Sequence, residues 1–438
     1  MNPTKILITK SDIQTCRDEV LEHAKDCNET GFAFFGEIRS NKVYVIKKIV
    51  LGGPRSERGH VSFTTDEVKI LEELKKAKTE NPKIRYLGDG HSHPWPTVPS
   101  PSGTDINQLS RSRKTRPWFV IAVFSSTGEV RFFGLDADSE RTEIPYQIVP
   151  DGFSEESLLE RIDQITDNDT LRKSRVGIIG CGSLASSVVS AISGTGICDY
   201  IVCDMDKLAT VNVIRHLGGI YDIGRSKTQI IKRHIESHNP LAVVQTVEDD
   251  LIKNRELLRS IIESCDIIVA ASGNPELNYH TNVICCELGK KAVYCGIYAG
   301  AKSAYVFCVS SGSHACFDCI FSLTSAAIDQ NTLRRKYGLE EGELKAAQGM
   351  FADITIPGSM MVKMTLWLLL GKEFIFNLVR YYDDLRVEKL NVPKKDLCAT
   401  CNYENWLKHE EEKTKEIRKS HTKGLVKKLR HRIRGLGR

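Results

Sequence analysis

Short runs of apolar residues, separated by polar and turn-forming segments, indicate that the chain alternates strands with helices. In the first 150 residues, several β-rich runs accompany one polar helical stretch at 65–78, which predicts a compact α/β domain. A polar helical connector follows at 151–170, and apolar strands then alternate with amphipathic segments over 171–406. That alternation predicts a sheet covered by helices on both faces. We therefore expect two α/β domains, 1–150 and 171–406, and a tail at 407–438.

The length and the cysteine content are consistent with a two-domain enzyme of the cytoplasm. A chain of 438 residues is about three times a typical domain. Its longest apolar run, 359–371, is interrupted by Lys363 and is shorter than the roughly 18 residues of a membrane helix. We therefore expect no membrane span, and the N-terminus does not resemble a signal peptide. The fourteen cysteines should then be thiols or metal ligands rather than disulfides.

The positive charge is concentrated in the tail. The net charge is +5, and residues 408–438 contain twelve Lys or Arg and four Glu, which is +8 and leaves about −3 for the rest. Such a tail could contact nucleic acid, an acidic partner or an anionic surface. No base-reading motif accompanies the charge, so a solvated amphipathic helix is favoured over each of these.

The segment LGDGHSHPWPTVPSPSGTD has the residues of a metal site. Alternate residues of a strand share a face, so His91 and His93 point to the same side and can bind one ion. The prolines that follow favour an ordered loop that returns the chain toward the histidines, where Asp105 becomes a third ligand. Zinc with three protein ligands keeps one position open for water. Glu29 could take the proton of that water, and Ser102 could hydrogen-bond the developing oxyanion.

Together these residues resemble the JAMM (JAB/MPN) zinc isopeptidases over roughly residues 1–140. The likeness rests on Glu29 with Gly31 and Gly36 in the next strand, on HSHP, and on PSPSGTD. The resemblance implies hydrolysis of the amide that joins the C-terminal glycine of a ubiquitin-like modifier to a lysine or to a following peptide. Eight residues separate the second histidine from Ser102, one more than is usual in that family.

A second motif, GIIGCGSLASS, is typical of phosphate binding. It places Gly180, Gly182 and Ala185 between a strand and a helix, where backbone amides and a helix N-terminus can hold phosphate. Dehydrogenases that bind dinucleotides use the same turn. The motif by itself therefore leaves a nicotinamide-dependent oxidoreductase as an alternative.

Polar residues beyond the next strand favour a nucleoside triphosphate. Asp204 is followed by Asn212, Arg215 and Lys227. A dehydrogenase needs one acid for the adenosine ribose, whereas two cations and an amide suit a triphosphate whose charge must be neutralised. The oxidoreductase alternative is disfavoured for this reason.

This set resembles the ubiquitin-activating-enzyme superfamily in its compact, Rossmann-like ThiF/MoeB form, over about 171–406. The resemblance implies ribose binding by Asp204 and phosphate contacts by Asn212, Arg215 and Lys227, the two cations being catalytic as well. Such proteins use ATP with magnesium to activate the C-terminal carboxylate of a ubiquitin-like or sulfur-carrier protein as an acyl-adenylate. They are generally homodimers.

Two CxxC pairs predict a second, structural zinc. Four thiolates complete a tetrahedral shell without an open position, and a zinc clip of this kind also belongs to the activating family. The expected ligands are Cys316, Cys319, Cys398 and Cys401. We therefore expect two zinc ions per chain.

The chain departs from the activating family at two points. Gly273 stands where the family normally has an aspartate for the magnesium ion, and residues 320–397 contain no cysteine to form a thioester. The remaining thiols have strand-like surroundings, which predict burial. They are Cys285, Cys286, Cys295 and Cys308.

The combined interpretation is a bifunctional enzyme of ubiquitin-like modifier metabolism. One domain would trim or release the modifier C-terminus, and the other would adenylate it. The alternative is an isopeptidase whose second domain only binds the modifier. Partners would be the modifier and a second copy of the chain, with a conjugating enzyme as a further candidate. Joined modules of this kind resemble prokaryotic conjugation systems, including those of antiviral defence islands, by analogy of fold.

Overall fold

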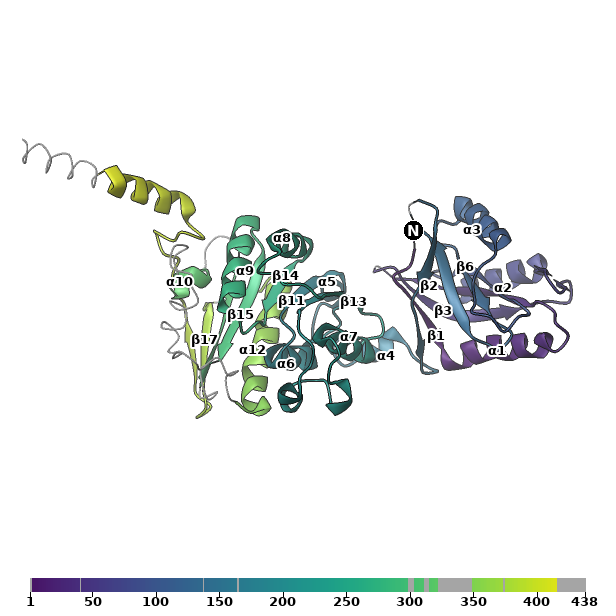
Figure 1. Cartoon of the computed structure of the whole chain (residues 1–438), viewed down its shortest axis with the longest axis horizontal. Helices are drawn as coiled ribbons and strands as arrows, with labels where there is room; N and C mark the ends of the chain where they lie inside the picture. Colours follow the sequence, from purple (N-terminus) through teal and green to yellow (C-terminus); the bar gives the residue numbers. More distant parts are fainter. Residues whose placement is uncertain are drawn as a thin grey trace, which may run out of the picture. The chain divides into compact units, whose positions relative to one another are not determined.

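The computed structural model divides the chain into two compact units (Figure 1). The first comprises Met1–Asn168 with Glu236–Val243, and the second comprises Asp169–Ile235 with Val244–Arg438. The structure describes residues 2–39, 41–136, 138–163, 165–297, 303–310, 315–321, 349–372 and 375–415. Most of the predicted basic tail, 416–438, lies outside the described residues.

An eight-stranded mixed sheet organises the described part of the first unit. Its order is β10-β1-β3-β2-β6-β7-β8-β9, so strands distant in sequence are neighbours. The central pair β2 and β6 is antiparallel, and β6 pairs with β7 in parallel. The strands are β1 (Lys5–Thr9), β2 (Gly31–Ile38), β3 (Val43–Leu51), β6 (Arg85–Ser92), β7 (Val120–Phe124), β8 (Val130–Leu135), β9 (Arg141–Ile144) and β10 (Tyr146–Val149).

Helices cover both faces of this sheet. Helix α1 (Lys10–Ala24) buries Ile13, Cys16 and Val20, a helical spacing, against one face. Helices α2 (Glu67–Glu80) and α3 (Gly103–Thr115) pack on the other face. The expected helix at 65–78 is therefore confirmed as α2, and the predicted β-rich runs of the first 150 residues include β2, β3, β7 and β8. A small hairpin, β4 (Glu57–Arg58) with β5 (Phe63–Thr64), precedes α2.

The connector is less helical than its composition predicts. Instead of one helix, the structure has two short ones, α4 (Glu155–Leu159) and α5 (Asn168–Lys173). The intervening ERIDQITD contains Asp163 and Asp167, and aspartate side chains compete for backbone hydrogen bonds and favour turns over helix interiors.

The second unit has the strand order of a doubly wound nucleotide-binding sheet. The order β13-β12-β11-β14-β15 corresponds to 3-2-1-4-5, with a topological switch point between β11 and β14. Antiparallel strands β16, β17 and β18 extend it. The strands are β11 (Arg175–Ile179), β12 (Asp199–Cys203), β13 (Val243–Val247), β14 (Ile267–Ala270), β15 (Lys291–Ile297), β16 (Ser303–Val309), β17 (Leu378–Tyr382) and β18 (Val387–Leu390).

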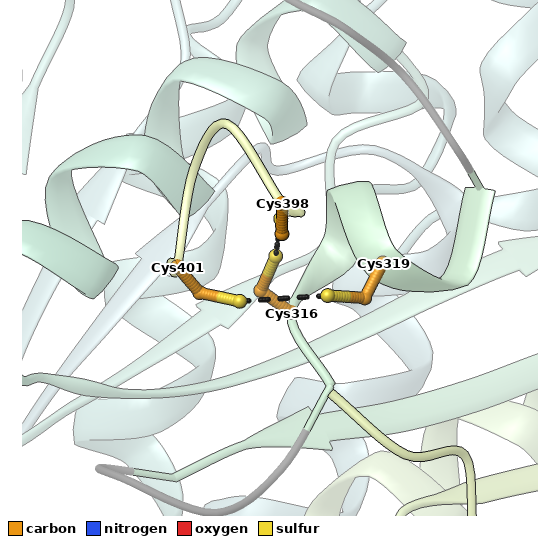
Figure 2. A group of neighbouring side chains, drawn as sticks. All are labelled: Cys316, Cys319, Cys398 and Cys401. Atoms are coloured by element: carbon orange, nitrogen blue, oxygen red, sulfur yellow. Dashed lines mark hydrogen bonds between the residues drawn. The ribbon is translucent and has the colours of Figure 1, made fainter. Parts of the chain in front are cut away.

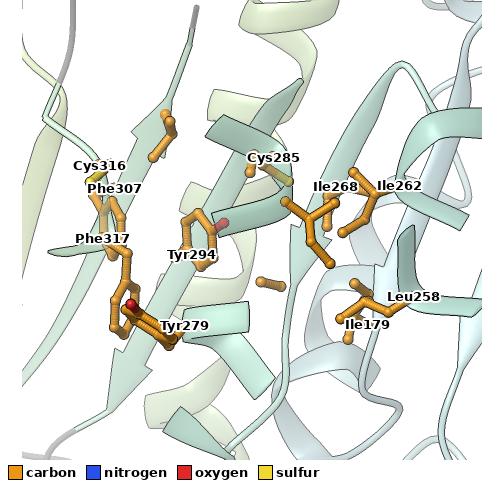
Figure 3. Close-up of a cluster of buried hydrophobic side chains, with 14 of the residues drawn as sticks. Ile179, Leu258, Ile262, Ile268, Tyr279, Cys285, Tyr294, Phe307, Cys316 and Phe317 are labelled. Atoms are coloured by element: carbon orange, nitrogen blue, oxygen red, sulfur yellow. The ribbon is translucent and has the colours of Figure 1, made fainter. Parts of the chain in front are cut away.

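Figure 1 shows helices α8 and α9 on one side of this sheet and α6 and α12 on the other. The apolar core under α8 and α9 includes Ile179, Ile268 and Tyr294 (Figure 3). Cys285 and Cys286 lie in helix α9, and not in strand-like surroundings as expected, whereas Cys295 and Cys308 are in strands. The helices are α6 (Ser183–Ile192), α7 (Lys227–His238), α8 (Arg255–Ser264), α9 (Pro275–Leu288), α10 (Phe317–Phe321) and α12 (Phe351–Leu369), with 3-10 turns η1 (Thr210–Arg215) and η2 (Ile220–Asp222).

The longest apolar run of the sequence falls mainly in α12, where it forms part of the core. Gly358 of α12 allows close approach to α6, because a Cβ there would lie 2.1 Å from Ser187 Oγ. The Ser187 hydroxyl donates to the carbonyl oxygen of Thr355 at 3.2 Å. Among the described residues, no helix combines the length and the apolar character needed to cross a membrane.

Candidate functional sites

Strand register brings the two halves of the first site together. Strands β2 and β6 pair with Gly31 opposite His91. Beyond the strands, the Ser92 amide donates to the Thr30 carbonyl at 2.9 Å, and the Thr30 amide donates to Ser92 Oγ at 3.0 Å. This continued pairing places Glu29 beside the end of β6. By strand alternation it belongs to the same side as the histidines.

His91, His93 and Asp105 form a three-ligand cluster, with ligand atoms all within 4.8 Å of one another. The two Nε2 atoms are 3.2 Å apart, and Asp105 oxygens lie 3.2 Å from His91 Nε2 and 3.5 Å from His93 Nε2. Tetrahedral zinc with ligand bonds of about 2.0–2.1 Å separates its ligand atoms by about 3.3–3.4 Å. The donor types and their separations therefore fit a zinc ion.

A capping box delivers Asp105 to this cluster. Ser102 is the N-cap of α3, its Oγ accepts from the Asp105 amide at 3.3 Å, and its own amide donates to Asp105 Oδ2 at 2.6 Å. Such boxes satisfy the free amides of a helix start. The hydroxyl hydrogen of Ser102 takes no part in these two bonds. Ser102 thus holds the first turn of α3 and retains a donor.

The charges of these groups are coupled. Partial burial raises the pKa of Glu29, while the charges of His91 and His93 act in the opposite direction. Burial also raises the pKa of Asp105, but hydrogen bonds from both histidines outweigh it and hold that pKa far below the usual range. The hydrogen bond to Asp105 raises the pKa of His93. Glu29 is therefore within electrostatic reach of all three expected ligands.

A polar network that the sequence analysis missed ties Glu29 to the β4–β5 hairpin. The Glu29 amide donates to the Gly59 carbonyl at 2.8 Å. Arg58 donates from Nε to Thr30 Oγ1 at 3.2 Å and pairs with Glu19 at 3.1 Å. Thr30 Oγ1 also donates to Glu19 at 2.8 Å. No sequence motif marks these residues, since only folding brings α1, the hairpin and β2 together.

At the switch point of the second unit, two glycines shape the loop after β11. Gly180 has a φ of +91°, and a Cβ there would lie 2.7 Å from Ser272 Cα, so the position requires glycine. Gly182 begins α6, and a Cβ built on it meets nothing within 4 Å. No described side chain caps α6 at Gly182, which leaves its first amides for an anion. Ala185 is buried in α6.

Asp204 and Lys227 lie beside this loop. The Cys181 amide donates to Asp204 Oδ2 at 2.6 Å, and the Asp206 amide donates to Asp204 Oδ1 at 2.8 Å. Lys227, the buried first residue of α7, places Nζ 2.7 Å from Asp206 Oδ2. Asp206, two residues after Asp204, thus links Lys227 to Asp204, a role that the sequence analysis did not assign.

Asn212 and Arg215 both lie in η1, which follows β12. Asn212 Oδ1 accepts from the Ala209 amide at 3.2 Å, and Arg215 is the last residue of η1. The next residue, His216, contacts the Cys181 carbonyl through Nε2 at 2.8 Å, and burial lowers its pKa. His216 therefore anchors the end of η1 to the glycine loop, a role that the sequence analysis did not assign.

Gly273 lies between β14 and α9, where the activating family has its aspartate. Asn274 is the N-cap of α9, and its amide donates to Ser272 Oγ at 3.0 Å. A Cβ on Gly273 would meet no atom within 4 Å. The backbone geometry of the loop is therefore compatible with a side chain that the sequence lacks.

The four expected cysteines converge between α10 and the segment after β18 (Figure 2). Cys316 and Cys398 have sulfurs 3.6 Å apart, and Cys319 and Cys401 have sulfurs 3.4 Å apart. Tetrahedral zinc with Zn–S bonds of about 2.3 Å separates thiolates by about 3.8 Å. Hydrogen bonds from neighbouring thiols, first that of Cys286, lower the pKa of Cys316 to about 3. The cluster has the chemistry and spacing to hold zinc, at the edge of the core shown in Figure 3.

With these features in place, the chain can be assigned to a class. The model of the ThiF family matches residues 154–403, more than half of the chain, and the chain belongs to the ThiF family.

Particular relatives are more distant. Ubiquitin-like modifier-activating enzyme 5 of Rattus norvegicus is 28% identical over 209 residues, 45% of this chain and 52% of that protein. The Dictyostelium discoideum enzyme of that name is 26% identical over 213 residues, 46% of this chain and 56% of its own. The chain thus matches about half the length of these curated relatives.

Among solved structures, E. coli MccB with ATP is similar with a TM-score of 0.45 and 19% identity, covering 53% of this chain and 68% of that one. MccB with AMPCPP and MccA has a TM-score of 0.47 and 18% identity, covering 58% and 76%.

Proposed function

We propose that the chain is a bifunctional enzyme that acts on the C-terminus of a ubiquitin-like modifier. The first unit would be a zinc isopeptidase, and the second would adenylate the modifier. The observation that supports the first activity best is the convergence of His91, His93 and Asp105 beside Glu29. Membership of the ThiF family supports the second.

For the isopeptidase, each residue has a defined task. Zinc held by the two histidines and Asp105 would supply Lewis acidity for attack of water on an amide carbon. Glu29 accepts the proton of the attacking water and delivers it to the leaving amine. Ser102 donates its free hydroxyl hydrogen to the oxyanion. The direct test is release of a peptide from the C-terminus of the glycine-terminated protein that the full chain captures in a pulldown.

For adenylation, the second unit would orient ATP for attack by the modifier carboxylate on the α-phosphate. Asp204 would bind the ribose, the loop at 180–182 and the start of α6 would take phosphate, and Asn212, Arg215 and Lys227 would neutralise charge. Magnesium would lessen the remaining phosphate charge. Because residues 320–397 contain no cysteine, the acyl-adenylate would pass directly to an acceptor without a thioester on the enzyme.

A modifier-binding domain without catalysis is the second candidate, and one specific observation favours it. Gly273 offers no carboxylate for the metal ion, and ion binding is part of charge neutralisation in phosphoryl chemistry. The space around Gly273 allows an aspartate at this position, which would supply the missing carboxylate.

ATP–pyrophosphate exchange with the captured modifier separates the two candidates. We expect measurable exchange in the natural chain, a loss of roughly 10²-fold or more in Arg215→Ala or Lys227→Ala, and an increase in Gly273→Asp. Arg259→Ala, on the exposed side of α8, should leave exchange unchanged. Exchange that is absent from the natural chain and from Gly273→Asp would establish the binding-only domain, and a thiol-sensitive adduct on a non-reducing gel would contradict the direct transfer.

Exposed apolar side chains on η1 and η2 support a homodimer through the second unit. Val211, Ile214, Ile220 and Tyr221 are 75%, 83%, 65% and 94% exposed, and several large apolar side chains exposed on neighbouring turns are typical of protein contacts. We expect Ile214→Asp with Tyr221→Ser to convert a dimer into a monomer in light scattering at micromolar concentration. Ile375→Asp, exposed elsewhere in the unit, should remain dimeric. A natural chain that is monomeric at all concentrations tested would rule the dimer out.

A further inference from the structure

The β4–β5 hairpin holds the backbone of Glu29 directly. The Glu29 amide donates to the carbonyl of Gly59, in the turn of the hairpin, at 2.8 Å. The ring of Phe63 lies against Gly31, where a Cβ would overlap it, and Gly31 pairs with His91 across β2 and β6. Residues that pair across two strands share a face of the sheet, so Phe63 seats the hairpin on the face that carries the histidines.

A hairpin this small depends on its anchors. Each strand has two residues, and an isolated two-stranded hairpin is marginally stable at best in water. A hydrogen bond of 2.8 Å from the Gly59 amide to the Ser62 carbonyl closes the turn. Among the described residues, β4 and β5 pair only with each other. The position of the Gly59 carbonyl, and with it that of the Glu29 amide, therefore depends on side-chain contacts.

Arg58 supplies a polar anchor through a closed ring of hydrogen bonds. Its Nε donates to Thr30 Oγ1 at 3.2 Å, and its Nη2 pairs with Glu19 Oε1 at 3.1 Å. Thr30 Oγ1 in turn donates to the same Glu19 oxygen at 2.8 Å. Because the guanidinium group is a planar, rigid fork, this ring fixes Arg58 in one orientation and ties the hairpin to helix α1.

The ring is largely shielded from water. Thr30 is fully buried, and the side chains of Arg58 and Glu19 are 23% and 12% exposed. Exposed ion pairs contribute little to stability, whereas charge-assisted hydrogen bonds in shielded surroundings are stronger. His23 Nε2 also lies 3.3 Å from Glu19 Oε1, so Glu19 retains a second partner when Arg58 is replaced.

Thr30 connects this ring to the strand of the expected zinc ligands. Its amide donates to Ser92 Oγ at 3.0 Å, and its carbonyl accepts from the Ser92 amide at 2.9 Å. Glu29 is thus held at its own amide by the hairpin and at the following residue by β6. Because the rotamers open to a side chain depend on the backbone angles of its residue, loss of the hairpin contact would widen the range of positions of the Glu29 carboxylate.

We propose that Arg58 is a positioning residue for Glu29. Arg58 holds the hairpin, and the hairpin holds the Glu29 amide, so that the carboxylate stays directed at the histidines. An anchor that served only the stability of the hairpin would not require its turn to bond to this particular residue. The role of Glu29 as the base rests on the proposed isopeptidase function, whereas the clamp on its backbone does not.

The first measurement is peptide release from the captured glycine-terminated protein, at equal zinc content. Misplacement of a reacting group by about 1 Å can cost roughly 10²-fold in rate, so Arg58→Gln should lower kcat by about 10–100-fold with KM nearly unchanged. Arg58→Lys should retain more activity, because its ammonium group can still reach one of the two acceptors. Thr30→Val, which keeps the ion pair and the side-chain shape, should resemble Arg58→Gln. Arg55→Gln, exposed in the same loop, should behave as the natural chain does.

A double substitution shows whether Arg58 acts through Glu29. In a chain that carries Glu29→Gln, replacement of Arg58 should cause no further loss, because the effects of residues that act as a unit do not add. A general weakening of the fold would instead lower the rate by the same factor in both backgrounds. That outcome, or a rate of Arg58→Gln equal to that of Arg55→Gln, would overturn the proposal.

Hydrogen exchange measures the clamp without any substrate. By mass spectrometry, the segment 25–31 should exchange faster in Arg58→Gln, since opening of the hairpin frees the Glu29 amide, and at the natural rate in Arg55→Gln. Unchanged exchange in Arg58→Gln would refute the clamp whether or not the chain cleaves. Faster exchange in a chain that cleaves no isopeptide would refute the proposed function and leave the clamp in place.

Discussion

Replacing Cys398 with serine should unfold the second unit. Four thiolates that bind zinc contribute about 10–16 kcal/mol of apparent binding free energy, comparable to or larger than the about 5–15 kcal/mol that stabilises a typical protein. Cys316, Cys319 and Cys398 are themselves part of the buried core, so loss of the ion leaves thiols and a hydroxyl in that core without a shared partner. We expect a large fall in soluble yield and loss of the unit's cooperative thermal transition.

Metal content is the decisive measurement for this prediction. The natural chain should contain two zinc ions, and any soluble Cys398→Ser should contain one. Cys286→Ser, which removes a thiol beside the cluster but outside the four, should keep two. His91→Ala should contain one and keep the thermal transition. A Cys398→Ser Cys401→Ser chain of unchanged stability would show that the cluster has no structural role.

Glu29→Gln should lower the rate of isopeptide cleavage by about 10²–10⁴-fold, the range attributed to a general base, or about 2.7–5.4 kcal/mol at 1.36 kcal/mol per tenfold. Glutamine keeps the shape and hydrogen bonding of the side chain but cannot accept the proton of the attacking water. Zinc content should not change, since Glu29 is not among the three clustered ligand residues.

The matched control is Glu22→Gln, an exposed carboxylate on α1, which should cleave at the natural rate. Rates must be compared at equal zinc content, because loss of metal would imitate loss of the base. Cleavage by Glu29→Gln at the rate of the control would exclude Glu29 from proton transfer.

Much of the architecture could be predicted from local patterns. Strands β2, β3, β7 and β8 follow from short β-rich apolar runs, and helix α2 follows from helical spacing of its apolar residues. The glycine loop after β11 follows from the short motif GIIGCG. These features depend on residues close in sequence, whose preferences act before tertiary contacts form. The single helical connector and the strand-like surroundings of Cys285 and Cys286 were predicted wrongly. In those segments, tertiary packing and turn-forming residues outweigh the local pattern of apolar residues.

The sequence by itself determined the donor types of both metal clusters, the glycine loop and the family-like order of Asp204, Asn212, Arg215 and Lys227. Only the tertiary structure decided which groups meet. The pairing of β2 with β6 sets Glu29 beside His91, the placement of α3 brings Asp105 to the histidines, and Asp206 and His216 join Lys227 and η1 to the loop. Such contacts depend on register and on helix placement, which are set by the whole core and not by any short segment.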